Sequence, residues 1–205
     1  MKPKDIGTDS DRALLLDFQA TLEIKPEKAI KLEKDALAKI ENITADNARL
    51  VSNLHANLGG LYRMNGHPDL AREHMEKSIS LLDQFNLLHI NDSIPQIANY
   101  AMFLTEQQEP ERGISELQKL SGIIKEYHSD DCLDYAKVQE TLGTIYLMTA
   151  NLPQAKTHFK RAFKIYEKIW ADEPEMIEAK YQEIQELYPQ IGFCIGKNLS
   201  GLLTK

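Results

Sequence analysis

Apolar residues recur every three or four positions over long stretches of the chain, and short polar segments separate these stretches. This spacing is typical of amphipathic helices, whereas strands alternate at every second residue. Most of the polar segments end in a proline, which is favoured in the first turn of a helix because the N–H that it lacks has no partner there. The segments lie at residues 23–26, 42–44, 65–68, 86–93, 107–110, 128–130, 150–153 and 172–174. The pattern predicts about nine helices and no strand, and therefore an all-α protein.

The predicted helices repeat in pairs. Leu58, Gly59, Tyr62, Ala71 and Met75 recur 84 residues later, in the same order, as Leu142, Gly143, Tyr146, Ala155 and Phe159. This shift is twice 42, and steps of 42 residues meet weaker copies that begin at Leu16, Tyr100 and Ile184. A fixed register along most of the chain indicates a tandem array of helical hairpins, because one hairpin cannot bury its apolar stripe without neighbours.

Small residues are expected where the two helices of a hairpin face each other. Gly59 and Gly143 allow the helices to approach closely, and Ala71 and Ala155 do the same from the second helix. The tyrosine three residues after each glycine fills the remaining space between the helices.

The order Leu-Gly-x-x-Tyr, followed by Ala-x-x-x-Phe or Ala-x-x-x-Met, resembles the tetratricopeptide repeat, whose usual length is about 34 residues. The 42-residue period is similar to that of kinesin light chains and of bacterial peptide-sensing regulators. The resemblance covers residues 11–188 and implies a right-handed α-solenoid of antiparallel helical hairpins, whose first helices line a concave groove. The chain departs from the family three positions before the Leu, where an aromatic residue is common and His55, Ile97 and Gln139 stand here.

This register divides the chain into three regions. We expect an N-terminal tail over 1–10, four repeat units and the first helix of a fifth over 11–189, and a C-terminal capping segment over 190–205. The last segment is apolar, with Leu199, Leu202 and Leu203. We expect it to pack by completing the fifth unit, by docking in the groove, or by forming a homodimer with a second copy.

Composition narrows the function. The chain has 24 Lys and Arg against 31 Asp and Glu, and its net charge of −7 argues against a nucleic-acid partner, because phosphate binding needs a basic surface. The sequence has no apolar stretch long enough for a membrane span, no apparent signal peptide and no CxxC pair, so we expect a cytoplasmic protein without a membrane partner. It has no phosphate-binding glycine loop, GxSxG or HExxH motif, so we expect no enzymatic activity, cofactor or metal.

Two clusters contain residue types that bind metals. His67 and His74 lie seven residues apart, and residues 128–132 read His-Ser-Asp-Asp-Cys. We interpret the histidines as solvated side chains. We interpret the second cluster as a loop that ends in a helix N-cap, where acidic residues are favoured.

The groove implied by the resemblance is the candidate binding site. Asn57, Asn99 and Thr141 hold equivalent positions in three consecutive first helices. An amide donates and accepts at once, which suits a peptide backbone, and asparagines of tetratricopeptide proteins often hold an extended peptide. We therefore predict a peptide-binding groove that also contains Asn53, Gly60, Arg63, Met102, Lys137, Glu140 and Thr144, with these side chains exposed in the absence of ligand. Ordinary polar residues on exposed helix faces are the alternative.

Two other interpretations compete. A carboxylate clamp like that of chaperone-binding relatives is disfavoured, because only Asn99 and Lys137 match it, while Ala56, Gly60 and Thr141 do not. A basic stripe of Lys156, Lys160, Lys164 and Lys168, with Arg161 beside it, is either a solvated outer face or a docking site for an acidic partner.

We therefore expect a non-enzymatic adaptor or sensor that binds a protein or peptide segment in its concave groove. The alternatives are a self-assembling structural subunit and a small-molecule sensor or enzyme accessory protein. The analogy to a fold family carries the functional part of this expectation.

Overall fold

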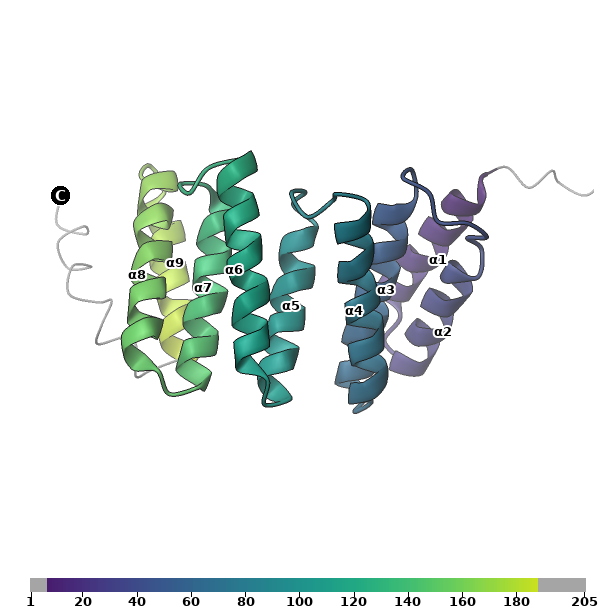
Figure 1. Ribbon diagram of the computed structural model, residues 1–205, viewed down its shortest axis with the longest axis horizontal. Helices are drawn as coiled ribbons and strands as arrows, with labels where there is room; N and C mark the ends of the chain where they lie inside the picture. Colours follow the sequence, from purple (N-terminus) through teal and green to yellow (C-terminus); the bar gives the residue numbers. More distant parts are fainter. Residues whose placement is uncertain (1–6, 188–205) are drawn as a thin grey trace, which may run out of the picture. The chain divides into compact units, whose positions relative to one another are not determined.

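All regular structure in this computed structural model is α-helical over residues 7–187, the part of the chain that it describes (Figure 1). The helices are α1 (Asp9–Leu22), α2 (Pro26–Leu37), α3 (Ala48–Met64), α4 (Pro68–Gln84), α5 (Ser93–Glu106), α6 (Pro110–Tyr127), α7 (Leu133–Met148), α8 (Leu152–Ile169) and α9 (Pro174–Leu187). For these residues the predicted all-α fold is confirmed. The capping segment predicted over 190–205, and with it the homodimer interface, lies outside the described residues.

A left-handed residue follows the first helix of three successive hairpins. Gly66, Gln108 and Ala150 are spaced 42 residues apart and have φ angles of 76°, 65° and 59°. In each case the next residue donates its backbone N–H to the carbonyl five residues before it: His67 to Tyr62, Glu109 to Leu104 and Asn151 to Tyr146, at 2.9, 2.8 and 2.7 Å. This geometry commonly ends helices. The unit around Tyr100, which is a weak copy in sequence, therefore keeps the register of its neighbours.

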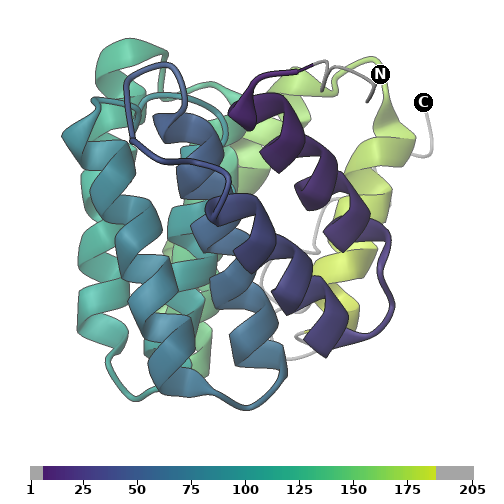
Figure 2. The ribbon, with the colours of Figure 1, turned by 90° about the vertical axis from the view of Figure 1, so that its right-hand side faces the viewer.

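The helices form two compact units, and the division falls within α5, between Phe103 and Leu104. In the first unit α1 packs on α2, α2 on α3 and α3 on α4. Figure 2 shows the α1–α2 hairpin, in the darkest colours, with its two helices side by side. In the second unit α6 packs on α7, α7 on α8 and α8 on α9. Each unit is thus built from stacked helical hairpins.

The glycines of the repeat lie at the closest approach of two helices, as predicted. A Cβ atom added to Gly59 of α3 would lie 2.5 Å from Cγ of Met75 and 3.3 Å from the carbonyl oxygen of Ala71 on α4. A Cβ atom added to Gly143 of α7 would lie 2.8 Å from Cδ2 of Phe159 on α8. Both distances are too short for packed carbon atoms, so any larger residue would force the facing side chain or its helix to move.

A paired tyrosine and histidine complete each of these two hairpins. The rings of Tyr62 and His74 stack with centroids 5.4 Å apart, and His74 Nδ1 lies 2.9 Å from His55 Nδ1. The same arrangement recurs 84 residues later, where Tyr146 stacks on His158 at 5.2 Å and His158 Nδ1 donates to Gln139 Oε1 at 2.9 Å. His55 and Gln139 stand where the family often has an aromatic residue, and here each supplies a polar partner for the second helix.

The histidine pair is part of the packing. Burial, together with the nearby His74 and Lys77, lowers the pKa of His55 to about 4, and burial lowers the pKa of His74 as well. Both rings are therefore neutral near pH 7 and one donates to the other. His74 is not the solvated side chain that its sequence position suggested.

We expect Gly143→Ala to lower the free energy of unfolding by about 1–3 kcal/mol, because the added methyl group overlaps the ring of Phe159. Gly122→Ala in α6 is the matched control. A Cβ atom there meets nothing within 4 Å, so the change should raise stability by up to about 1 kcal/mol through helix propensity. Urea unfolding followed by circular dichroism measures both. Equal effects of the two substitutions would contradict the close approach.

Candidate functional site

A polar hollow lies between the first helices of the first unit. It has a volume of about 420 Å³ and is lined from α1, α3 and the segment from Asn91 to Asn99. A second hollow of about 210 Å³ adjoins it and shares Ala56, Gln96 and Asn99 with it. We call the two together the first-unit groove. Five of the ten predicted peptide-binding residues line it: Asn53, Asn57, Gly60, Arg63 and Asn99.

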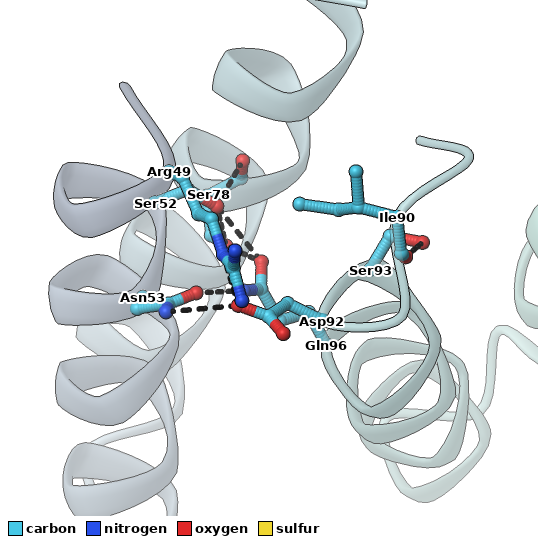
Figure 3. A network of polar contacts seen from close by, with 8 residues as sticks. All are labelled: Arg49, Ser52, Asn53, Ser78, Ile90, Asp92, Ser93 and Gln96. Atoms are coloured by element: carbon cyan, nitrogen blue, oxygen red, sulfur yellow. Dashed lines mark hydrogen bonds and ion pairs between the residues drawn. The ribbon is translucent and has the colours of Figure 1, made fainter. Parts of the chain in front are cut away.

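A chain of hydrogen bonds runs beside this groove and joins α3, α4 and the start of α5 (Figure 3). Gln96 is at its centre. Its Oε1 accepts from the hydroxyl groups of Ser52 and Ser78 at 2.8 and 2.6 Å, and its Nε2 donates to Asn53 Oδ1 at 2.6 Å. Ser52 and Ser78 are fully buried, so these bonds satisfy polar groups that would otherwise destabilise the fold.

The network ends at an ion pair on the rim of the groove. Asn53 Nδ2 donates to Asp92 Oδ2 at 3.3 Å, and Arg49 Nε donates to the same oxygen at 2.6 Å. The hydrogen bond from Arg49 holds the pKa of Asp92 below its usual range, so this carboxylate stays ionised. Asn53 is thus engaged through both its oxygen and its nitrogen.

Asn57 makes a second cluster with two acidic residues. Its Nδ2 donates to Asp17 Oδ1 of α1 at 2.9 Å and to Glu33 Oε1 of α2 at 3.2 Å. Glu33 is only 1% exposed, and its Oε2 has no hydrogen-bond partner. Burial, and then the neighbouring Asp17 carboxylate, raise the pKa of Glu33 to about 8, so this group holds its proton at neutral pH.

These contacts correct one expectation. Asn53 and Asn57 are half-buried and hydrogen-bonded, whereas the sequence predicted that their side chains are exposed. Asn99 fits the prediction, because it is exposed and its side chain makes no hydrogen bond within the described residues. Met102 is half-buried and lines neither hollow of the groove.

The other predicted residues lie on α7, in the second unit. Glu140 accepts from Lys180 Nζ at 2.9 Å and from the Tyr166 hydroxyl at 2.6 Å, which ties α7 to α8 and α9. Thr141 and Thr144 donate to the carbonyl groups four residues before them in the same helix, at 3.0 and 3.1 Å. Lys137 lines a hollow of about 290 Å³ together with Tyr166, Trp170 and Lys180.

The lysine stripe of α8 divides into two groups. Arg161, Lys164 and Lys168 line a hollow of about 380 Å³ with Lys125, Asp130, Asp131, Tyr135 and Ile165, whereas Lys156 and Lys160 are exposed outside it. Lys168 forms an ion pair with Asp131, and Lys125 lies 3.7 Å from Asp130. Two of the four basic residues in this hollow therefore already have carboxylate partners.

Reasoning from the sequence missed four residues of the groove region: Asp17, Glu33, Asp92 and Gln96. For Glu33 a signal existed, because it lies between the buried Ala29 and Ala36 at helical spacing and so falls on the apolar face of α2. Asp92 comes from a polar loop, and nothing in its local sequence shows that Arg49 and Asn53 reach it.

The interpretation of residues 128–132 as a loop that ends in a helix N-cap is confirmed at Cys132, whose Sγ accepts the backbone N–H of Tyr135 at 3.4 Å at the start of α7.

Between residues 7 and 187, no three His, Cys, Asp or Glu side chains are placed to hold a metal ion. In the same range, no helix is both long and apolar enough to span a membrane.

Glu33→Gln tests the buried carboxyl group. Its pKa is about 8 in the folded protein against 4.5 for an exposed glutamate, so folding takes up a proton between these pH values. The stabilising effect is complete below pH 4.5 and is lost as the pH rises to about 8. The glutamine should remove this slope and raise stability at pH 8 by about 1–3 kcal/mol.

The measurement is urea unfolding at a series of pH values from acidic to alkaline. Asp35→Asn, an exposed change on the same helix, should keep the wild-type slope. A wild-type slope in the Glu33→Gln protein would show that another group carries the pH dependence.

The comparisons with known proteins agree with the repeat geometry. Residues 93–168, from α5 to α8, match the tetratricopeptide repeat family model. No curated protein matches the sequence. Among solved structures, BtubC (BKLC) from P. vanneervenii has a TM-score of 0.71 at 17% identity, over 93% of this chain and 76% of that one.

A Podosopora anserina kinesin light chain protein with nearly identical TPR-like repeats has a TM-score of 0.69 at 13% identity, over 82% of this chain and 81% of that one. At such identities the likeness shows the fold. Residues 93–168 thus resemble the tetratricopeptide repeat in sequence, and the chain shares the helical-repeat fold of these two structures.

Proposed function

We propose that the chain is a non-enzymatic adaptor or sensor that holds an extended segment of a protein partner in the first-unit groove. Helical repeat scaffolds present extended concave surfaces, and interaction with other proteins is the role that these surfaces support. The groove lies on the first helices, and its two hollows share residues and so form a continuous surface.

The observation that carries this proposal is the state of Asn99. It lines both hollows, it is exposed, and its side chain makes no hydrogen bond within the described chain. Asn57 complements it, since its Nδ2 is occupied by Asp17 and Glu33 while its Oδ1 remains an acceptor. An extended peptide presents N–H and C=O groups along both edges. The amide oxygen of these asparagines can accept from a peptide N–H, and the amide nitrogen of Asn99 can donate to a peptide C=O.

A second candidate site has an observation of its own. In the hollow on α8, Arg161 and Lys164 have no carboxylate within ion-pair distance in the described residues, which suits an acidic partner. We therefore keep docking of an acidic segment on this outer face as the alternative to the groove.

We further propose that the protein acts in the cytoplasm and needs no cofactor. Two competing functions are a self-assembling structural subunit and a small-molecule sensor or enzyme accessory protein. An unbiased pull-down, together with the mass of the protein in solution, separates the three. A stoichiometric protein partner supports the adaptor, an ordered oligomer without another partner supports the structural subunit, and a co-purified metabolite supports the sensor.

Asn99→Ala is the direct test of the groove. Against a partner captured by the wild-type protein, it should weaken binding by about 1–3 kcal/mol, because backbone groups of the bound segment lose their hydrogen-bond partner. It should leave the melting temperature unchanged, because Asn99 is exposed and unbonded in the free protein. Isothermal titration calorimetry and thermal unfolding measure the two effects.

Two matched variants complete this test. Lys156→Ala, on α8 and outside its hollow, should leave binding intact. The double variant Arg161→Ala/Lys164→Ala should also leave it intact if the groove is the site. Loss of binding in the double variant, with full binding in Asn99→Ala, would show that the partner binds the outer face of α8 and not the groove.

A further inference from the structure

We propose that the first-unit groove selects a partner segment that carries a lysine or arginine, and that the cationic side chain is bound beside Asp17 and Asp92. This inference rests on the proposed function and adds the chemistry of the partner.

The charged residues that line the 420 Å³ hollow are all acidic. Asp17 and Asp92 are among its lining residues, and no lysine or arginine is. Asp92 is compensated by Arg49, whose side chain is largely exposed. Asp17 has no basic partner within the described residues: it accepts from the neutral amide of Asn57 and interacts with the protonated Glu33 carboxyl group. The uncompensated charge of the hollow is therefore that of Asp17.

A second observation lies directly behind Asp17. The Glu33 carboxyl group is bonded to the same Asn57 amide, it is almost completely buried, and its Oε2 lacks a partner. The free protein thus keeps a carboxylate and an incompletely satisfied carboxyl group together at one end of the groove. Because Glu33 holds its proton, the charge at this end is that of Asp17, and a cation brought there would compensate it. Charge-assisted hydrogen bonds are stronger than neutral ones.

The acceptors of the hollow fit the donors of such a side chain. Asn57 donates through Nδ2, so its Oδ1 is left to accept. Asp92 Oδ1 likewise accepts no hydrogen bond in the described chain, because Arg49 and Asn53 both bind Oδ2. With the Asp17 carboxylate they form an acceptor-rich surface, whereas a lysine or arginine head is purely a donor.

The adjoining hollow is different. Arg63 lines it and no carboxylate does. Like charges repel at short range, so a cationic side chain is favoured at the Asp17 end of the groove and disfavoured at the Arg63 end.

Selection from a random dodecapeptide phage library on the full-length protein tests the inference. We expect the selected peptides to share a lysine or arginine at one position. In a synthetic copy of such a peptide, replacement of that residue by norleucine should weaken binding to the wild-type protein about ten- to hundredfold. Because this comparison needs no protein variant, it does not depend on how well a variant folds.

Asp17→Asn should weaken binding of the lysine or arginine peptide by a similar factor and leave binding of its norleucine copy almost unchanged. The substitution in the protein and the substitution in the peptide remove the same interaction, so their effects do not add. Asp35→Asn, an exposed charge removal on α2, should leave both affinities unchanged.

Two outcomes would overturn the inference. One leaves the proposed groove function standing, and the other refutes it as well. Peptides that depend on Asn99 but show no basic residue and no response to Asp17→Asn would refute the charge selection and leave the proposed groove function standing. Absence of any peptide that depends on Asn99, or binding of free spermidine at Asp17 without peptide binding, would refute the groove function as well.

Discussion

The close approach of two helices within a hairpin is the constraint on which the rest of the structure depends. At Gly59 and Gly143 the facing side chains of Met75 and Phe159 come nearer than any Cβ atom would allow. Tight contact within a hairpin leaves its outer apolar residues on a surface that a neighbouring hairpin can cover, and both units show such stacking between α2 and α3 and between α6 and α7. Tyrosine–histidine pairs lie beside these glycines, and each histidine contacts His55 or Gln139, at the position where the family often has an aromatic residue.

Polar contacts between hairpins then shape the groove. Gln96 links α5 to α3 and α4 through buried hydroxyl groups, and Asn57 links α3 to α1 and α2 through two carboxyl groups. Polar groups in such positions are costly unless they are satisfied, and fully bonded networks fix one arrangement of the helices. Asn53 and Asn57 thus line the groove and also hold the hairpins in register, whereas Asn99 lines the groove without such bonds in the described residues.

The groove and the outer face of α8 differ in the sign of their free charge. The groove offers the uncompensated carboxylate of Asp17, and the hollow on α8 offers Arg161 and Lys164. Amide groups that hold a peptide backbone give affinity with little selectivity, because every peptide has a backbone. Charged side chains add selectivity by excluding partners of the wrong sign. In this protein amide and carboxylate groups line the same hollow, so a segment bound there, as we propose, would meet both kinds of recognition.

The sequence by itself determined the helices, most of their boundaries and the 42-residue register, because these depend on local properties: apolar spacing, prolines in first turns and small residues at fixed positions. Between α2 and α3, where no proline marks the start of a helix, the predicted break at 42–44 is shorter than the observed one at 38–47. It also indicated the helix face on which Asn57 and Asn99 lie, since a repeat places equivalent residues alike. Only the tertiary structure decided what each polar side chain does there. Asn57 and Asn99 are equivalent in the repeat, yet Asn57 is bonded to Asp17 and Glu33, whereas the Asn99 side chain makes no hydrogen bond within residues 7–187. The partners of Asn57 come from helices 24 to 40 residues away in the chain. Such contacts depend on how hairpins stack, and no local pattern in the sequence records them.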